Sequence, residues 1–392
     1  MHSSIRDSGT DSPSAEPDAC TTTPEICNGL DDNCDGRIDE DTCTGRAVAV
    51  TTGGGGAQGM TTCAVLSDGT VACWGSNQDG AIGLGVPGPD VRFPTRLPGL
   101  EDVVDVGVGG YAECVRKRSG EIVCWGEVDH PGAPPDPEPP RVYDGLGPAS
   151  QMSVTSSGLC TVVPEYTVMC SGYIVGPLTR GPLWSPEGLV EPVQVSVTPS
   201  NACVVERRGT VQCWGRNWYG ELGDGSVADP TSGNRVTPGL VQDLNDAIQV
   251  SVGGGSVCAL RAGHTVVCWG PRFGAADPYS VLRTVPEVVP GLMDVTSISS
   301  GEMHTCALLR SGSIRCWGEN REGQLGDGTT RRSVDPVLVV GLDDAVSISC
   351  GWETTCAVRA TGQVMCWGNN RNGAIGVPGR PSVLVPTLVP LP

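Results

Sequence analysis

The chain has 392 residues, among them 56 glycines and 32 prolines, and its 44 acidic against 25 basic side chains give a net charge of −19. A chain with this negative charge repels phosphate backbones, and Lys117 is its only lysine. We therefore expect no binding to nucleic acids. The sequence contains no apolar run long enough for a transmembrane segment and no helix-period apolar stripe, so we predict an all-β protein.

Residues 1–24 are rich in serine, threonine, aspartate and proline and offer little to bury, so we predict a disordered spacer. The segment resembles the tether that follows the lipid-modified cysteine in bacterial surface lipoproteins. The alternative is an unstructured tail with no role. Residues 1–6 contain no apolar h-region, so no signal peptide is visible, and we expect a leader or a lipid anchor to precede Met1. The alternative is that the cysteines stay reduced in a cytosol.

Residues 25–46 form an acidic, cysteine-containing segment with the spacing of a calcium loop. Aspartate or asparagine stands at loop positions one, three and five, and Gly36 allows the sharp turn at position six. The predicted Ca²⁺ ligands are the side chains of Asp31, Asn33, Asp35, Asp39 and Glu40 and the carbonyl oxygen of Arg37. Position twelve is Thr42, where an EF-hand requires a bidentate glutamate, so Glu40 or Asp41 would have to complete a tighter loop.

This segment closely resembles a short acidic, cysteine-bearing metal-binding motif of bacterial secreted proteins, and also the calcium repeats of thrombospondin type 3. The resemblance implies a bound metal ion. The alternative is a solvated acidic run held by disulfides. Cys20, Cys27, Cys34 and Cys43 form an even set with three possible pairings, between which the sequence does not choose.

From residue 47 to residue 392 one pattern occurs seven times: a cysteine, nine residues and a second cysteine. The pairs are Cys63 with Cys73, Cys114 with Cys124, Cys160 with Cys170, Cys203 with Cys213, Cys258 with Cys268, Cys306 with Cys316, and Cys356 with Cys366. Alternating segments around a central glycine predict a β-hairpin whose three-residue loop has a positive φ at its third position. We assign that position to Gly69, Gly120, Gly209, Gly263, Gly312 and Gly362. Such a turn places the two cysteines opposite each other, so we predict a disulfide across every hairpin.

Six of the seven copies continue with Trp-Gly after the second cysteine, at Trp74, Trp125, Trp214, Trp269, Trp317 and Trp367. Small and β-branched residues precede each hairpin and a proline-bearing segment follows it, which makes four strands per unit. Small residues suit strands that converge near a propeller axis. We therefore predict a seven-bladed β-propeller over residues 47–392, with these tryptophans filling the space between adjacent blades.

Residues 304–330 (HTCALLRSGSIRCWGENREGQLGDGTT) and 61–85 (TTCAVLSDGTVACWGSNQDGAIGLG) resemble the regulator of chromosome condensation repeat, which forms seven-bladed propellers. Copies one, four, six and seven match it well, whereas copies two, three and five lose the glycine-rich loop after the hairpin. Relatives include a nucleotide exchange factor for a small GTPase, a plant UV-B photoreceptor and a secreted inhibitor of β-lactamase. The resemblance therefore implies a fold and leaves the function open.

Fourteen of the nineteen cysteines lie in regular pairs, which indicates an oxidising compartment, so we expect an extracellular or bacterial cell-surface protein. The glycine-rich loops lack a lysine and the four histidines have no suggestive partner in sequence, so we do not expect an enzyme. We expect a monomeric, non-catalytic scaffold that binds a protein or a glycan through loops on a propeller face. The alternatives are a secreted enzyme inhibitor and, third, an enzyme with a site on one face.

Aromatic residues outside the Trp-Gly positions are the candidate binding residues, because aromatics on the loops of a rigid scaffold are favoured anchors. The candidates are Tyr173, Trp184, Trp218 and Tyr219. Equivalent loops of successive repeats emerge as neighbours, so we expect Trp184 to lie beside Trp218 and Tyr219. The alternative is that these side chains cover blade edges.

Two further residues stand out against the repeat. Trp352 follows an inner strand and is assigned to the opposite face or to the channel mouth. Cys350 is the odd cysteine and occupies an inner-strand position, so we predict a buried free thiol.

Overall fold

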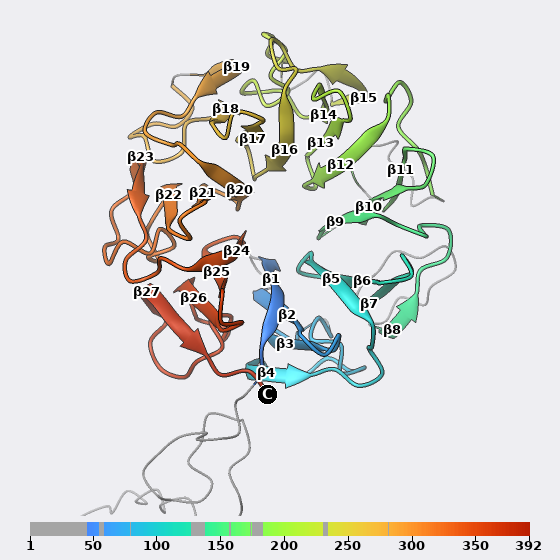
Figure 1. Ribbon diagram of the computed structural model, residues 1–392, viewed down its shortest axis with the longest axis vertical. Coiled ribbons are helices and arrows are strands. Elements are labelled where there is room, and N and C mark those ends of the chain that lie inside the picture. Colours follow the sequence, from blue (N-terminus) through green and yellow to red (C-terminus); the bar gives the residue numbers. More distant parts are fainter. Residues whose placement is uncertain are drawn as a thin grey trace, which may run out of the picture.

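The computed structural model describes residues 45–54, 59–78, 80–126, 138–156, 158–172, 174, 183–229, 234–280 and 282–392. Their strands form seven separate antiparallel sheets, arranged as blades around a central axis (Figure 1). The predicted all-β, seven-bladed propeller is confirmed. The spacer and the acidic module predicted over residues 1–46 lie outside the described residues, apart from residues 45 and 46. Within the described ranges, no helix is long and apolar enough to cross a membrane.

Each blade is built from consecutive strands, with the first strand nearest the axis. Blade 1 contains β1 (Ala47–Gly54), β2 (Met60–Leu66), β3 (Val71–Gly75) and β4 (Val91–Arg96). Blade 2 contains β5 (Val103–Val108), β6 (Ala112–Lys117), β7 (Ile122–Gly126) and β8 (Glu138–Val142). Blade 3 contains β9 (Gln151–Thr155), β10 (Gly158–Val163) and β11 (Thr167–Gly172). Blade 4 contains β12 (Pro192–Val197), β13 (Asn201–Glu206), β14 (Val211–Gly215) and β15 (Arg235–Leu240).

The remaining three blades complete the ring. Blade 5 contains β16 (Ala247–Val252), β17 (Val257–Arg261), β18 (Val266–Gly270) and β19 (Arg283–Val288). Blade 6 contains β20 (Val295–Ser300), β21 (His304–Leu309), β22 (Ile314–Gly318) and β23 (Ser333–Leu338). Blade 7 contains β24 (Ala345–Cys350), β25 (Thr354–Arg359), β26 (Val364–Asn369) and β27 (Ser382–Val389).

The second and third strands of every blade form the predicted hairpin, and in each one the two cysteines face each other in register. All seven disulfides form, with Cα–Cα distances of 4.1 to 4.2 Å. They join Cys63 to Cys73, Cys114 to Cys124, Cys160 to Cys170, Cys203 to Cys213, Cys258 to Cys268, Cys306 to Cys316, and Cys356 to Cys366. The predicted disulfide across each hairpin is therefore confirmed.

One predicted turn residue is wrong. In blade 5 the positive φ belongs to His264 (φ 59°) and not to Gly263. The register of the cysteines decides this, because His264 follows Cys258 by the same six residues that separate Gly312 from Cys306. The imidazole Nδ1 of His264 lies 2.9 Å from the carbonyl oxygen of Val295, a contact that holds the residue in this unusual conformation.

Close to the axis, neighbouring blades are joined by a ring of side chain–backbone hydrogen bonds. In blades 3 to 7, a serine hydroxyl on the inner strand accepts an N–H from the inner strand of the next blade. The pairs are Val197 to Ser153 (3.1 Å), Val252 to Ser196 (3.0 Å), Ser300 to Ser251 (2.8 Å), Cys350 to Ser299 (2.9 Å) and Thr52 to Ser349 (3.1 Å). These bonds link blades 3, 4, 5, 6, 7 and 1 in succession.

Further from the axis, the tryptophans of the Trp-Gly pairs fill the space between blades, as predicted. Trp74, Trp125, Trp214, Trp269 and Trp367 are fully buried, and Trp317 is 7% exposed. Four indole N–H groups donate to a carbonyl in the loop that follows the third strand of the preceding blade. The pairs are Trp74 to Ala374 (2.9 Å), Trp125 to Ala81 (2.8 Å), Trp269 to Glu221 (2.9 Å) and Trp367 to Gln324 (2.9 Å).

The ring closes without any exchange of strands between the first and last blades. Strands β1 to β4 form one sheet and β24 to β27 another, and the C-terminus ends beside β4 (Figure 1). The contacts across this closing interface are those found elsewhere: Trp74 to Ala374, Thr52 to Ser349, and the N–H of Ala47 to the carbonyl of the hairpin residue Gly362 (2.8 Å). Closure therefore uses the same interface as the rest of the ring.

We expect the tryptophan contact to depend on the glycine beneath it. Gly326 has a φ of +67°, and a Cβ there would lie 2.7 Å from the Nε1 of Trp367. Gly326→Ala should therefore lower the free energy of unfolding by about 1–3 kcal/mol more than Gly341→Ala. Gly341 is the matched control, because its φ is +75° and nothing lies within 4 Å of its added Cβ. Denaturant unfolding of the two disulfide-intact variants measures the difference, and equal losses would contradict the contact.

Candidate functional site

The antiparallel connectivity divides the loops between two faces of the disc. Loops from the first to the second strand and from the third to the fourth strand emerge together on what we call the loop face. In blade 6, for example, the N–H of Glu319 after β22 donates to the carbonyl of Met303 before β21 (2.9 Å). The hairpin turns and the links between blades lie on the opposite, hairpin face.

In blades 1, 4, 6 and 7, an asparagine side chain shapes the loop after the third strand. Its Oδ1 accepts the backbone N–H five residues further on. The pairs are Asn77 with Ile82 (3.2 Å), Asn217 with Leu222 (3.0 Å), Asn320 with Leu325 (2.9 Å) and Asn370 with Ile375 (3.1 Å). These bonds satisfy loop N–H groups locally, so the four loops are firm supports for the side chains they carry.

Four aromatic side chains of blades 4 and 5 lie on the loop face, and we call them the aromatic patch: Trp218, Tyr219, Phe273 and Tyr279. The ring centroids of Tyr219 and Tyr279 are 4.5 Å apart, and Phe273 meets Tyr279 edge-on at 6.4 Å. Tyr279 is 44% exposed, Trp218 and Tyr219 are half-buried, and Phe273 is buried. Phe273 thus anchors the patch in the core, while Tyr279 is accessible to a partner.

Arg216 connects the aromatic patch to the central channel. Its guanidinium carbon lies 5.4 Å from the centroid of the Trp218 ring. Its Nε donates to Oε1 of the fully buried Glu221 (2.9 Å), and its terminal nitrogen donates to the carbonyl of Gly254 (2.8 Å). The second oxygen of Glu221 accepts the N–H of Tyr219 (2.7 Å). Arg216 and Glu221 therefore form a fixed ion pair under the patch.

A cavity of about 230 Å³ opens where the channel meets the loop face. Its walls come mainly from glycines and small residues of the loops between first and second strands. Trp352, 38% exposed, and Glu302 also line it. Burial raises the pKa of the Glu302 carboxyl, and the nearby Arg216 charge opposes this. Of the two positions considered for Trp352, the channel mouth is the one observed, because the inner strand runs toward the loop face.

The repeat identified in the sequence is also recognised by family models. Models of the regulator of chromosome condensation (RCC1) repeat match residues 68–114, 208–260 and 311–358, and also residues 295–324 and 345–374. The chain is an RCC1-repeat β-propeller. A metal-binding motif of the MopE copper-binding type matches residues 12–40. Among curated proteins, none matches the chain.

Solved structures share the fold of this RCC1-repeat propeller. Prp20p from Saccharomyces cerevisiae is 19% identical with a TM-score of 0.72, over 82% of this chain and 86% of that one. Human WBSCR16 is 18% identical with a TM-score of 0.71, over 83% and 94%. The CRINKLY ectodomain of the Arabidopsis thaliana receptor kinase ACR4 is 18% identical with a TM-score of 0.52, over 86% and 98%. At these identities the likeness shows the fold alone.

The structure separates the predicted binding residues of the propeller. Trp218 and Tyr219 lie on the loop face as part of the aromatic patch. The prediction that Trp184 lies beside them in a face loop is wrong: it pairs with Cys170 of β11 through two backbone hydrogen bonds (2.8 and 3.0 Å) and packs against the core between blades 3 and 4. Trp184 thus takes the outer-strand place of a blade that otherwise has three strands. Tyr173 lies outside the described residues.

The predicted metal ligands Asp31, Asn33, Asp35, Arg37, Asp39 and Glu40 also lie outside the described residues. Sequence reasoning missed Arg216 and Glu302 altogether. A comparison of the repeats could have found Arg216, because Ser76, Glu319 and Asn369 stand at its position in blades 1, 6 and 7. The same comparison could have found Glu302, because it stands at the position that Trp352 occupies in blade 7.

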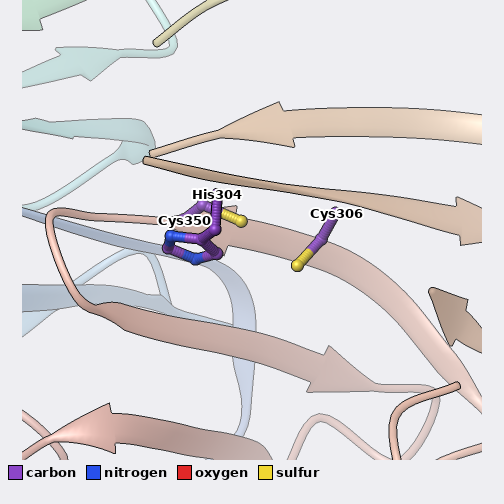
Figure 2. A group of neighbouring side chains, drawn as sticks. All are labelled: His304, Cys306 and Cys350. Atoms are coloured by element: carbon purple, nitrogen blue, oxygen red, sulfur yellow. The ribbon is translucent and has the colours of Figure 1, made fainter. Parts of the chain in front are cut away.

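Between blades 6 and 7 the RCC1-repeat core contains a cysteine–histidine cluster. Figure 2 shows His304 and Cys306 on β21 together with Cys350 on β24, and their ligand-type atoms lie within 4.8 Å of one another. Cys306 is disulfide-bonded to Cys316, whereas Cys350 is the buried free thiol that was predicted. Burial raises the pKa of the Cys350 thiol to about 12, so the thiol stays protonated.

His304 is held as a neutral imidazole. Thr355 Oγ1 donates its proton to the carbonyl of Gln324 (2.8 Å), so it accepts from Nε2–H of His304 (2.8 Å). Nδ1 therefore carries the lone pair and has no hydrogen-bond partner among the described residues. Burial lowers the pKa of His304 to about 3. This cluster is packed core of the blade 6–7 interface in the disulfide-bonded protein.

The buried imidazole should make the protein less stable as the pH falls. Its pKa is lower in the folded state (about 3) than in the unfolded state (about 6.5), so below pH ~6.5 only the unfolded chain gains the proton. In His304→Thr the imidazole is replaced by the threonine that blades 1 and 7 carry at this position, as Thr61 and Thr354. The slope of the unfolding free energy against pH between pH 6.5 and 3 should then decrease, by up to about 1.4 kcal/mol per pH unit. His264→Asn in a hairpin turn is the control. An unchanged slope in His304→Thr would show that the imidazole is charged in the fold.

Proposed function

We propose that this RCC1-repeat propeller is a non-catalytic binding scaffold that recognises a protein partner through its loop face. The observation that carries the proposal is the aromatic patch, where Tyr279 stands 44% exposed on a buried aromatic base. Tyrosine and tryptophan on a rigid support bury much apolar area at little cost in side-chain entropy, which is typical of interface hot spots. A glycan, the second candidate ligand, would use the same rings by stacking.

The channel supports binding in preference to catalysis. Its mouth is walled by glycine backbone and small hydroxyl side chains, and the ionisable residues that line it are Tyr111, Glu302 and Cys350. The Cys350 thiol is kept protonated by burial, so it is a poor nucleophile. An inhibitor that caps a secreted enzyme with its loop face is a special case of the same proposal.

The disulfides and the MopE-type motif suggest a secreted or extracellular protein. We further propose display at a bacterial surface, with residues 1–24 as a tether, because that segment resembles lipoprotein spacers. The rigid propeller would then present its loop face away from the anchor. Among the similar folds is that of yeast RCC1 (Prp20), in a structure with Kap60 bound to it.

A binding experiment with paired variants tests the patch. Tyr279→Ala and Trp218→Ala should each reduce retention of the partner captured from extracellular or envelope extracts, by roughly thirtyfold in affinity for a hot spot of about 2 kcal/mol. Tyr166→Asn is the matched control, since Tyr166 is 45% exposed on the hairpin face, at a turn with a φ of 55° that asparagine tolerates. If Tyr166→Asn lost binding while both patch variants retained it, the binding site would lie on the hairpin face instead.

For the N-terminal motif we propose Ca²⁺ as the ion. The aspartate and asparagine oxygens of residues 31–40 are ligands that Ca²⁺ prefers, whereas copper favours nitrogen and sulfur. Titration calorimetry of the full, disulfide-bonded chain should show Ca²⁺ binding with a Kd on the order of 10⁻⁴–10⁻³ M, lost in the double variant Asp31→Asn with Asp35→Asn. Heat from Cu²⁺ alone would contradict the assignment.

A further inference from the structure

Glu302 is the one acidic side chain that lines the channel mouth among the described residues. Its carboxylate lies directly over the backbone of Gly254 in the preceding blade, blade 5, where any Cβ would come within 2.2–2.4 Å of the carboxylate atoms. Within the described residues, no hydrogen bond or ion pair joins the carboxylate oxygens of Glu302 to another group, although its main-chain carbonyl accepts the N–H of Gly254 (3.1 Å). The carboxylate therefore has acceptor positions that the hydrogen-bond donors of a partner can fill.

The charge of Glu302 is not balanced by its neighbours. Arg216 is near enough to favour the charged form of Glu302, but it is already paired with Glu221 and bonded to the Gly254 carbonyl. Arg216 and Glu221 cancel, so one negative charge remains at the junction of the channel and the aromatic patch. The N–H of Glu302 donates to the carbonyl of Gly351 (3.3 Å), so Glu302 and the 38% exposed Trp352 lie on adjacent loops that line the same cavity.

We propose that Glu302 and Trp352 form a subsite for an arginine side chain of the partner. A guanidinium can donate a pair of hydrogen bonds to the carboxylate while its plane stacks on the exposed ring of Trp352. The cavity of about 230 Å³ leaves room for such a side chain beside Trp352. This inference rests on the proposed protein-binding function and adds to it the chemistry of one contact.

A cationic side chain fits this subsite better than a metal ion does. Ca²⁺ and Mg²⁺ require six or more oxygen ligands, and Glu302 is the sole carboxylate lining the described cavity. An aromatic ring beside a single carboxylate provides the surroundings that a guanidinium favours. The net charge of −19 also attracts a basic partner over longer range.

The test uses the full chain and a small probe. N-acetyl-arginine methylamide should shift the indole N–H resonances of Trp218 or Trp352 saturably in NMR titrations, while the neutral citrulline analogue should not. Glu302→Gln should weaken arginine binding by about tenfold or more. Asp343→Asn removes the same charge from the exposed hairpin face and should leave binding unchanged.

Equal binding of the arginine and citrulline probes, or no weakening in Glu302→Gln, would overturn the subsite. The inference can fail while the proposed function stands: in that case partner binding remains sensitive to Tyr279→Ala although Glu302→Gln has no effect on the probe. If Tyr279→Ala also had no effect on partner binding, the proposed loop-face site would be contradicted as well.

Discussion

The structure depends on one repeated contact, in which a buried tryptophan of blades 1, 2, 5 and 7 donates its indole N–H to a loop of the blade before it. The contact needs three sequence features at once: the Trp-Gly after the second cysteine, a loop held by an asparagine, and a glycine beneath the indole. A Cβ at Gly326 would collide with the indole of Trp367, so the glycine cannot be replaced without moving the blade. The repeat motif therefore encodes the interface between blades as well as the blade itself.

This contact also links the scaffold to the candidate site. In blade 4 the backbone carbonyl of Glu221 accepts the indole N–H of Trp269, while the side chain of the same residue holds Arg216 under Trp218. The aromatic patch is thus built on the joint between blades 4 and 5. A site at such a joint is rigid, because moving it would break the packing of both blades.

The hairpins, disulfides and interblade tryptophans could be predicted because each follows from local spacing that recurs along the chain. The turn at His264 follows from the same spacing, although the adjacent Gly263 favoured another assignment, whereas the placement of Trp184 could not be predicted because it lies in a copy that departs from the pattern. Trp184 replaces a missing outer strand, which only the pairing with Cys170 reveals. Glu302 was missed for another reason: its significance arises from Gly254 and Arg216, which belong to other blades and meet it only in space.

The ring closes through the same contacts that join its other blades, although propellers could also close by exchanging a strand. Here Trp74 contacts blade 7 as Trp367 contacts blade 6, with the same indole–carbonyl distance of 2.9 Å. The inner serine bond and the hairpin carbonyl bond recur as well, at Thr52 and Ala47. The seam should therefore be no weaker and no stronger than an ordinary interface.

The most direct measurement compares Trp→Phe substitutions at the seam and within the ring. Each removes one indole N–H donor, while the carbonyls of Ala374 and Gln324 keep the hydroxyls of Thr62 and Thr355 as donors, so the loss is that of a single hydrogen bond, about 0.5–1.5 kcal/mol. Trp74→Phe at the seam should lower the free energy of unfolding by the same amount as Trp125→Phe and Trp367→Phe, to within about 0.5 kcal/mol. A loss at Trp74 that is absent at the other two positions, or the reverse, would contradict an account in which one repeated contact holds and closes the propeller.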